Sequence, residues 1–338
     1  MNKIEHMFAT PSASTPGPSV SAPECYRPRS YALQMPTSLP AENAALLALL
    51  RTRPEGATWQ YLTTEVLDCG SAQSVWESYT TPELLPDPAR VSDLEQATTD
   101  LKQWQSRGLR FLSVLDPEYP RQLRDIHQVP PFLFAAGTLV HDDTAVSVVG
   151  SRKATERGLQ ITRTITSGLV DRGITVLSGL AEGIDAAAHN QALSSGGRTV
   201  AIIGTGITKY YPAANRALQD SIRSSGLVLS QFWPEASPTR YSFPMRNAVM
   251  SGYGIASIIV EASEHSGARI QARLAVEHGR PVVLTDAVVS ATEWGRSLAE
   301  QPGVHVASST AEVMGVIEEI QRRRDTLPEL LSALAVTG

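Results

Sequence analysis

Short apolar runs alternate with segments of helical spacing along the chain from about residue 144 onward. The runs are rich in β-branched residues and contain few polar positions, which is typical of strands buried on both faces of a parallel sheet. We therefore predict strands at 145–150, 175–179, 199–204, 227–231, 257–262, 281–285 and 304–308. Strands that alternate with helices in this way form a doubly wound, mainly parallel α/β sheet, because right-handed crossovers place helices on its faces.

Two further apolar runs, 109–115 and 130–137, precede this alternation and are also predicted to be strands. Several of the helical segments end in a glycine, which supplies the left-handed turn that commonly closes a helix. These glycines are Gly173, Gly196, Gly226 and Gly279.

The chain before residue 107 has a different pattern. Residues 1–40 contain seven of the 22 prolines, mixed with Ser, Thr, Ala and Gly, so we expect a disordered tail that cannot bury enough surface to fold. Residues 41–106 contain the leucine-rich stretch AENAALLALL and two serine-led segments, which predict a small helical module. This module either packs as a cap on the main domain or contacts DNA or another protein. We assign residues 107–324 to the main domain and 325–338 to a short C-terminal tail.

Composition narrows the class of protein. The 338 residues are 42% hydrophobic and 19% charged, which is typical of a globular protein. With two cysteines, Cys25 and Cys69, and neither a signal-peptide pattern nor a long apolar segment, we expect a soluble cytoplasmic protein. The net charge of −5 argues against a general coat for polyanions, so any site for nucleic acid must gather its cations locally.

Small and cationic residues follow the predicted strands. Gly150, Ser151, Arg152 and Lys153 come directly after the strand at 145–150, and the later loops read SGLAEGID, GTG and SGAR. In a doubly wound sheet these loops share one edge, where ligands bind outside the carboxyl ends of the strands. The planar guanidinium of arginine suits phosphate oxygens, and helix N-termini add partial positive charge. This edge therefore predicts an anion site, most simply for phosphate.

Other kinds of site are less well supported. The GTG at 204–206 lacks the full dinucleotide fingerprint, and the chain contains no P-loop. Asp185 and His189 stand four residues apart, but no third metal ligand is evident, so we expect them to hydrogen-bond within the fold. A triad with Ser178 is disfavoured because the GxSxG motif is absent. Glu261 is interpreted as an anchor for Arg246 or for a loop amide rather than as a catalytic group.

Several stretches resemble the DNA-processing protein A (DprA/Smf) family. The resemblance covers about residues 107–285 and includes VSVVGSRKATERG, LSGLAEGIDAAAHNQAL, TVAIIGTGITKYYPAANRAL, FPMRNAVMSG and IVEASEHSGARIQARLAVEHGRPV in the family's order. Proteins of this family have an extended Rossmann sheet, form dimers and load the recombinase RecA onto incoming single-stranded DNA during natural transformation. The resemblance thus implies a non-enzymatic DNA-binding protein without a cofactor or metal.

The resemblance and the strand-end pattern together give a set of expected DNA or phosphate contacts. They are Gly150, Ser151, Arg152, Lys153, Gly179, Gly204, Gly206, Lys209, Arg246, Asn247, Ser266, Gly267 and Arg269. Aromatic side chains near these loops are candidates for stacking on bases. They are Tyr210, Tyr211, Phe232, Trp233 and Phe243.

The chain also departs from the family pattern. Ala248 follows Arg246-Asn247 where the family has RNR, and Arg269 adds a cation in the SGAR stretch. The family's Pro-Gly loop after Gly279-Arg280 is replaced by VVLTDAVVS, and we expect no winged-helix domain in residues 325–338. Two other functions therefore remain open: a sensor of nucleotides or small ligands, and a defence protein that recognises foreign DNA on the same sheet.

Overall fold

The computed structural model describes residues 38–79 and 88–336. The chain divides into two compact units, Met1–Tyr119 with Val129–Leu133 and Pro120–Gln128 with Phe134–Gly338. Most of the expected N-terminal tail, residues 1–37, lies outside the described residues. The expected boundary at 106/107 falls inside the first unit, because the segment that follows the helices packs with them.

The first unit is a helical module. Its helices are α1 (Leu39–Thr52), η1 (Pro54–Gly56), α2 (Trp59–Cys69), α3 (Ala72–Ser78) and α4 (Pro88–Ser106), followed by strand β1 (Arg110–Ser113). Leu46, Leu47, Leu49 and Leu50 of α1 are buried, as the apolar pattern of this stretch predicts. The carboxylate of Glu42 accepts hydrogen bonds from the backbone N–H groups of Ala72 and Gln73, at 2.6 and 3.1 Å. One buried acid on α1 therefore caps the start of α3.

The second unit contains the predicted α/β sheet. Its strands are β2 (Phe132–Gly137, shared with the first unit), β3 (Ala145–Val149), β4 (Thr175–Ser178), β5 (Thr199–Ile202), β6 (Leu227–Ser230), β7 (Ala256–Ile259), β8 (Val282–Thr285) and β9 (Val304–Ala307). They follow the order β2-β6-β5-β4-β3-β7-β8-β9. Only β2 runs antiparallel to its neighbour β6, and β3 to β9 are parallel. The predicted mainly parallel sheet is confirmed.

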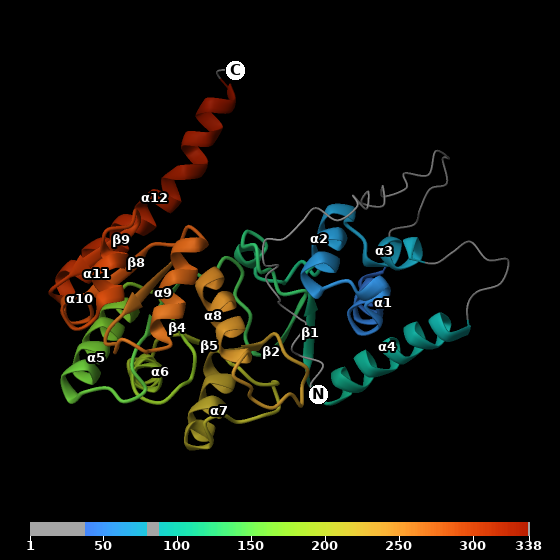
Figure 1. Ribbon diagram of the computed structural model, residues 1–338, viewed down its shortest axis with the longest axis horizontal. Helices are drawn as coiled ribbons and strands as arrows, with labels where there is room; N and C mark the ends of the chain where they lie inside the picture. Colours follow the sequence, from blue (N-terminus) through green and yellow to red (C-terminus); the bar gives the residue numbers. More distant parts are fainter. Residues whose placement is uncertain (1–37, 80–87, 337–338) are drawn as a thin grey trace. The chain divides into compact units, whose positions relative to one another are not determined.

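Helices cover both faces of this sheet (Figure 1). They are η2 (Arg121–Leu123), α5 (Glu156–Val170), α6 (Ile184–Ser194), η3 (Ala213–Asn215), α7 (Arg216–Ser225), α8 (Ser242–Tyr253), α9 (Ala268–Glu277), α10 (Asp286–Ala291), α11 (Glu293–Ala299) and α12 (Thr310–Val336). Val146 and Val148 of β3 pack in a core with α5, α6 and α12. Ser147, which points to the opposite face, donates its hydroxyl to the carbonyl of Met250 on α8. The fold is thus doubly wound, as predicted.

The chain reverses its direction across the sheet at β3. From β3 it runs outward through β4, β5 and β6, and it then returns to place β7 on the other side of β3. Ligands of doubly wound folds bind in the crevice at such a switch point, outside the carboxyl ends of the strands. The loops after β3 and β7 are therefore the first place to look for a site.

The glycines predicted to end helices differ in their backbone conformation. Gly173, Gly196 and Gly279 have φ values of 68°, 68° and 66°, so the predicted left-handed turns are confirmed. Gly226 has φ −142°, and for this residue the prediction is wrong. A glycine is needed there because a Cβ would overlap the carbonyl oxygen of Thr199. The expected boundary at 324/325 falls within α12, which continues as one helix from Thr310 to Val336.

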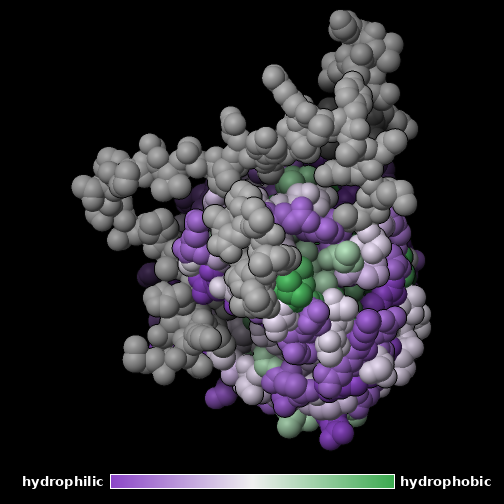
Figure 2. Space-filling view, turned by 90° about the vertical axis from the view of Figure 1, so that its right-hand side faces the viewer, coloured by the Kyte–Doolittle hydropathy of each residue, from purple (hydrophilic) through white to green (hydrophobic). Residues whose placement is uncertain are grey.

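The described surface is mainly polar. Few large hydrophobic side chains are exposed, namely Tyr61, Val91, Val140, Tyr211, Tyr241 and Val306. Where Figure 2 is coloured, it shows a largely hydrophilic face with isolated hydrophobic residues. Within residues 38–79 and 88–336, no helix has the length and apolar character needed to span a bilayer.

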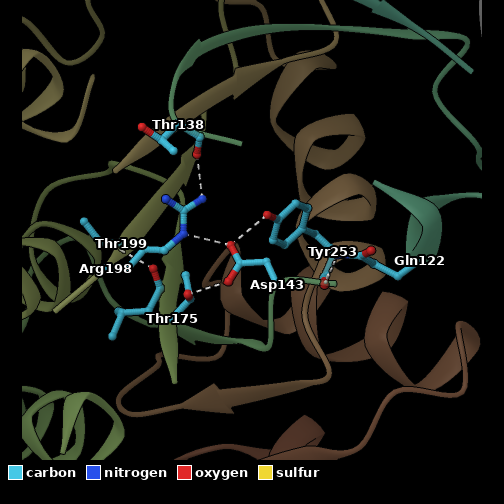
Figure 3. A network of polar contacts seen from close by, with 8 residues as sticks. Gln122, Thr138, Asp143, Thr175, Arg198, Thr199 and Tyr253 are labelled. Atoms are coloured by element: carbon cyan, nitrogen blue, oxygen red, sulfur yellow. Dashed lines mark hydrogen bonds and ion pairs between the residues drawn. The ribbon is translucent and has the colours of Figure 1, made fainter. Parts of the chain in front are cut away.

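A buried polar network joins the amino ends of the central strands (Figure 3). Asp143, which precedes β3, is only 6% exposed. Its carboxylate accepts hydrogen bonds from the Thr175 hydroxyl at 2.5 Å, Arg198 Nε at 3.1 Å and the Tyr253 hydroxyl at 3.0 Å. Burial and the adjacent carboxylate both raise the pKa of Tyr253, which therefore stays a hydrogen-bond donor. The network ties the starts of β3, β4 and β5 to the end of α8.

Candidate functional site

A cavity of about 470 Å³ lies at the switch point, beside the carboxyl ends of β3 and β7. Its walls come from the loop after β3, the first turn of α6, the first half of α8 and the segment from the loop after β7 into α9. Eight of the residues expected to bind phosphate line it, namely Gly150, Ser151, Arg152, Lys153, Arg246, Asn247, Ser266 and Gly267.

The loop after β3 is fixed to the neighbouring strand's loop. The backbone N–H of Ser151 donates to the carbonyl of Glu261 at 2.7 Å. A Cβ on Gly150 would approach that same oxygen to 2.7 Å, so the close passage requires a glycine. The Glu261 carboxylate accepts the N–H of Thr155, the N-cap residue of α5, at 3.0 Å. Glu261 is therefore an anchor, as expected, and its partner is a loop amide rather than Arg246.

Arg246 forms the charged floor of the cavity. It is only 5% exposed, and its Nη1 donates to the carbonyls of Gly179 and Ile202, the latter at 3.0 Å. Among the described residues, its Nε has no hydrogen-bond partner. Burial lowers the pKa of Arg246, the nearby Asp185 carboxylate opposes that shift, and Arg152 adds to it. An arginine keeps its charge under such shifts, because its ordinary pKa exceeds 12.

Gly179 explains how this guanidinium fits. A Cβ on Gly179 would overlap Nη1 of Arg246, so the glycine makes room for the buried cation. The carboxylate of Asp185 is near this cation and accepts hydrogen bonds from the backbone N–H groups of Gly179 and Ala181, at 3.2 and 3.3 Å. Burial raises the pKa of Asp185, while Arg246 and these two amides lower it.

Arg152 and Lys153 bring exposed positive charge to the cavity. The Cζ of Arg152 lies 5.2 Å from the ring centroid of Phe243, a cation–π arrangement that orients the guanidinium. Within the described part of the chain, neither Arg152 nor Lys153 forms an ion pair. Two exposed cations and a third, buried one leave the cavity with surplus positive charge, which is suited to an anion.

A smaller cavity of about 90 Å³ adjoins the first, and both are lined by Arg152, Ala181, Phe243 and Arg246. Gly179 and Gly204, two more of the expected residues, line the smaller one. A Cβ on Gly204 would lie 3.0 Å from the ring of Phe243. The rings of Tyr211 and Phe243 are 5.6 Å apart at 44°. Two of the five stacking candidates are thus at the cavities.

Three expected contact residues line neither cavity. Lys209 forms an ion pair with Glu235 at 3.2 Å. Gly206 packs below the carbonyls of Trp233 and Pro234, where a Cβ would overlap them. Arg269 is exposed in the first turn of α9. Of the other stacking candidates, Tyr210 packs against Arg216 and Arg223, and Phe232 and Trp233 are also absent from the cavity walls.

His189 is part of the support below the site. It is fully buried, and its Nδ1 lies 2.7 Å from the Thr199 hydroxyl. Burial, together with the charge of Arg246, lowers its pKa to about 3, so the ring is neutral. Asp185 and His189 therefore hydrogen-bond within the fold, as the sequence predicted. The described residues include no cluster of three or more His, Cys, Asp or Glu side chains able to hold a metal ion.

Sequence reasoning did not find every residue at the site. His265 and Gln271 also line the large cavity, and Glu182 lines the small one. The sequence indicates only that these residues are close to a strand-end motif. It does not indicate whether their side chains point into the cavity. Leu180, in the same wall as Glu182, has φ 58°. No sequence signal predicts a left-handed leucine, since a bulky side chain disfavours that conformation.

A family model described as DNA recombination-mediator protein A matches residues 110–320. Protein Smf of Synechocystis sp. is 41% identical over 187 residues, which cover 54% of this chain and 47% of that protein. DNA processing protein DprA of Streptococcus pneumoniae is 37% identical over 208 residues, covering 61% of this chain and 73% of that one. The chain thus matches only about half the length of the Synechocystis protein.

Two solved structures share the fold. The X-ray structure of DNA processing protein A from Streptococcus pneumoniae has a TM-score of 0.58 and 31% identity, covering 82% of this chain and 95% of that one. A structure of the Helicobacter pylori protein, which describes its single-stranded DNA binding mode, has a TM-score of 0.55 and 22% identity, with coverages of 62% and 96%. At that identity the second structure shows the common fold alone.

Proposed function

Because the chain belongs to the DNA recombination-mediator protein A family, we propose that its switch-point cavity binds the sugar-phosphate chain of single-stranded DNA. The observation that carries the proposal is the convergence of Arg152, Lys153 and the buried Arg246 on one cavity. Backbone N–H groups and guanidinium forks are the donors that proteins use for phosphate oxygens. The relatives named DNA processing protein and the DNA-binding Helicobacter pylori structure support the choice of ligand.

Single strands are favoured over duplex by the aromatic side chains. Tyr211 is 41% exposed and lies beside Phe243 at the smaller cavity. Bases can stack on such rings only when they are unpaired, and each stacked base contributes about 1–3 kcal/mol. We therefore expect duplex DNA of the same sequence to bind more weakly.

The proposed biological role extends the family description, which names a recombination mediator. In this proposal the protein binds single-stranded DNA in the cytoplasm, acts as a homodimer and passes the strand to a RecA-type recombinase. It does so without catalysis or a cofactor. Asp185, the carboxylate that lines the larger cavity, already accepts hydrogen bonds from two backbone amides, which supports a binding role. Co-precipitation with RecA, with and without an oligonucleotide, tests the partner, and light scattering tests the dimer.

A gel-shift titration over a range of salt concentrations tests DNA binding. Single-stranded and duplex oligonucleotides of equal length are compared on the wild type and on Arg152→Ala. Strand-selective binding that weakens with salt and with the substitution supports the proposal, since each neutralised phosphate releases counterions. Absence of binding at low salt, with a mononucleotide raising the melting temperature instead, contradicts it and favours a nucleotide sensor.

A further inference from the structure

The two cavities are adjacent and share part of their walls. Arg152, Ala181, Phe243 and Arg246 line both and form the partition between them. The larger cavity adds Ser151, Lys153 and Asn247, which are donors suited to phosphate. The smaller cavity adds Tyr211, Gly179, Leu180 and Glu182. A nucleotide held across this partition would place its phosphate on one side and its base on the other.

The wall of the smaller cavity has an unusual backbone. Leu180 is fully buried and adopts φ 58°, a conformation that leucine rarely takes. The side-chain amide of Asn215 donates to the carbonyls of Leu180 and Ala181, at 3.0 and 3.3 Å. Strained residues held by such contacts concentrate at binding and active sites. This anchoring holds the backbone leading to Glu182 in place at the cavity.

Glu182 is an acid in a place that otherwise suits an anion. It is exposed, it lines the smaller cavity with Arg152 and Arg246, and its carboxylate has no hydrogen bond or ion pair within the described part of the chain. A negative charge beside a phosphate site weakens binding of the phosphate chain by repulsion. The same carboxylate is a strong acceptor for an N–H group that enters the cavity, and the amino group of cytosine is such a donor.

We propose that the smaller cavity is a nucleobase slot in which the Glu182 carboxylate accepts a hydrogen bond from the exocyclic amine of cytosine. This inference rests on the proposed binding of single-stranded DNA. Thymine presents a carbonyl oxygen at the equivalent position, which the carboxylate repels. The protein therefore discriminates between two pyrimidines of similar size, while the rings of Tyr211 and Phe243 contact either one.

Fluorescence anisotropy with labelled oligo(dC) and oligo(dT) of equal length, at slightly alkaline pH, tests the slot. We expect the wild type to bind oligo(dC) about 10- to 100-fold more tightly, the factor equivalent to one charge-assisted hydrogen bond. Glu182→Gln should bring the ratio below about 2-fold, because its amide can accept from cytosine or donate to thymine. Removing the charge should also tighten binding of oligo(dT).

A matched control separates a contact from a general charge effect. Glu156→Gln removes one negative charge from an exposed residue in the first turn of α5, outside both cavities, and should leave the ratio unchanged. Equal dissociation constants for oligo(dC) and oligo(dT) on the wild type, with salt-sensitive binding to both, overturn the slot and leave the proposed function intact. A ratio of oligo(dC) to oligo(dT) affinity that is the same in Glu182→Gln as in the wild type also overturns the slot and leaves the proposed function intact. Failure of the wild type to bind either oligonucleotide at low salt overturns the proposed function and the slot with it.

Discussion

A buried charged side chain lies at each end of the parallel strands, and the two differ in their hydrogen bonds. We call the side where the strands begin the amino edge and the side where they end the carboxyl edge. At the amino edge, Asp143 accepts hydrogen bonds from Thr175, Arg198 and Tyr253. At the carboxyl edge, Arg246 is equally buried, but its Nε has no partner in the described structure. Cations without ion pairs also stand above Arg246, whereas the amino edge balances its carboxylate within the fold.

This difference separates a structural network from a candidate binding site. A buried charge whose hydrogen bonds are complete contributes to the fold and offers nothing to a ligand. A buried charge with an unused donor, at the bottom of a cavity, is set up to complete its hydrogen bonds with an external group. We therefore expect substitutions at the amino edge to change stability alone, and substitutions of the cations at the carboxyl edge to change DNA binding.

The largest expected effect comes from Arg246→Met, because this residue serves both stability and binding. Removing the guanidinium leaves the carbonyls of Gly179 and Ile202 without their donor and takes a nearby positive charge away from the buried Asp185. Together these losses should lower the free energy of unfolding by about 3–5 kcal/mol. Binding of single-stranded DNA should be lost as well. Urea denaturation and anisotropy measure the two effects, and unchanged DNA affinity would contradict the role of Arg246 at the cavity floor.

The pH dependence of Arg246→Met gives a second check. Burial already raises the pKa of Asp185, and Arg246 opposes that rise, so the substitution raises the pKa further. The folded variant then binds a proton that the unfolded chain does not, and its stability increases as the pH falls through the raised pKa. The deficit relative to wild type should therefore be smaller at about pH 5.5 than at about pH 8.

The next effect tests the amino edge. Asp143→Asn keeps the shape of the side chain but removes the charge that Arg198, Thr175 and Tyr253 share. We expect a loss of about 1.5–3 kcal/mol in unfolding free energy, as for hydrogen bonds to a charged group, and DNA affinity unchanged within about 2-fold. Asp171→Asn, at an exposed position after α5, is the control. A parallel loss of DNA binding in folded Asp143→Asn would break the comparison.

Arg152→Ala should weaken DNA binding and leave stability almost unchanged, the reverse of what we expect for Asp143→Asn. The side chain is exposed and lines both cavities, so its loss should weaken binding of single-stranded DNA about 10- to 100-fold, or about 1.4–2.8 kcal/mol. The salt dependence should fall by about one phosphate contact, and unfolding free energy should change by less than about 0.5 kcal/mol. Arg163→Ala, on the exposed face of α5, controls for the loss of one positive charge. Equal effects of the two substitutions would mean that Arg152 acts through net charge alone.

His189 lies between the edges and titrates in a predictable direction. Its pKa is lowered to about 3 in the fold, whereas an unfolded histidine takes up a proton near pH 6.5. The unfolded chain therefore binds more protons between these values, and stability falls as the pH drops from about 6.5 toward 3, at up to about 1.4 kcal/mol per pH unit. In His189→Gln this contribution should disappear from denaturation curves recorded between about pH 6.5 and 5. An unchanged slope would contradict a buried neutral ring.

The sequence predicted the fold and the position of the carboxyl-edge site for the same reason. Strands buried on both faces are apolar throughout, and parallel strands bring their following loops to a shared edge. Thus the segments containing Arg152, Arg246 and Ser266 could be placed together from the sequence. The direction of a side chain within a loop depends on the local backbone, which is why Lys209 lies against Glu235 and Arg269 lies outside both cavities.

The amino-edge network was not predictable. Asp143 meets Arg198 and Tyr253 from positions 55 and 110 residues away in the chain, and none of the three lies in a motif. The burial of Arg246 was also missed, because arginine is rarely buried. Its guanidinium is accommodated only because Gly179 leaves space for it. In that case the motif was recognised, but the glycine was interpreted as a ligand contact and not as room for a cation.

The smallest expected effect distinguishes between glycines of the same site. Gly267 has φ −60°, and a Cβ there would meet nothing within 4 Å, so Gly267→Ala should change unfolding free energy by less than about 0.5 kcal/mol. Gly179→Ala, in contrast, would place a methyl group against Arg246 and should disturb both stability and binding. We expect Gly267→Ala to alter the affinity for single-stranded DNA by no more than about 2-fold. A loss of tenfold or more, without a change in stability, would mean that the sugar-phosphate chain passes directly against this turn. The closest approach of the DNA would then lie at the rim of the cavity formed by the loop after β7, and the buried guanidinium would act on it from a distance.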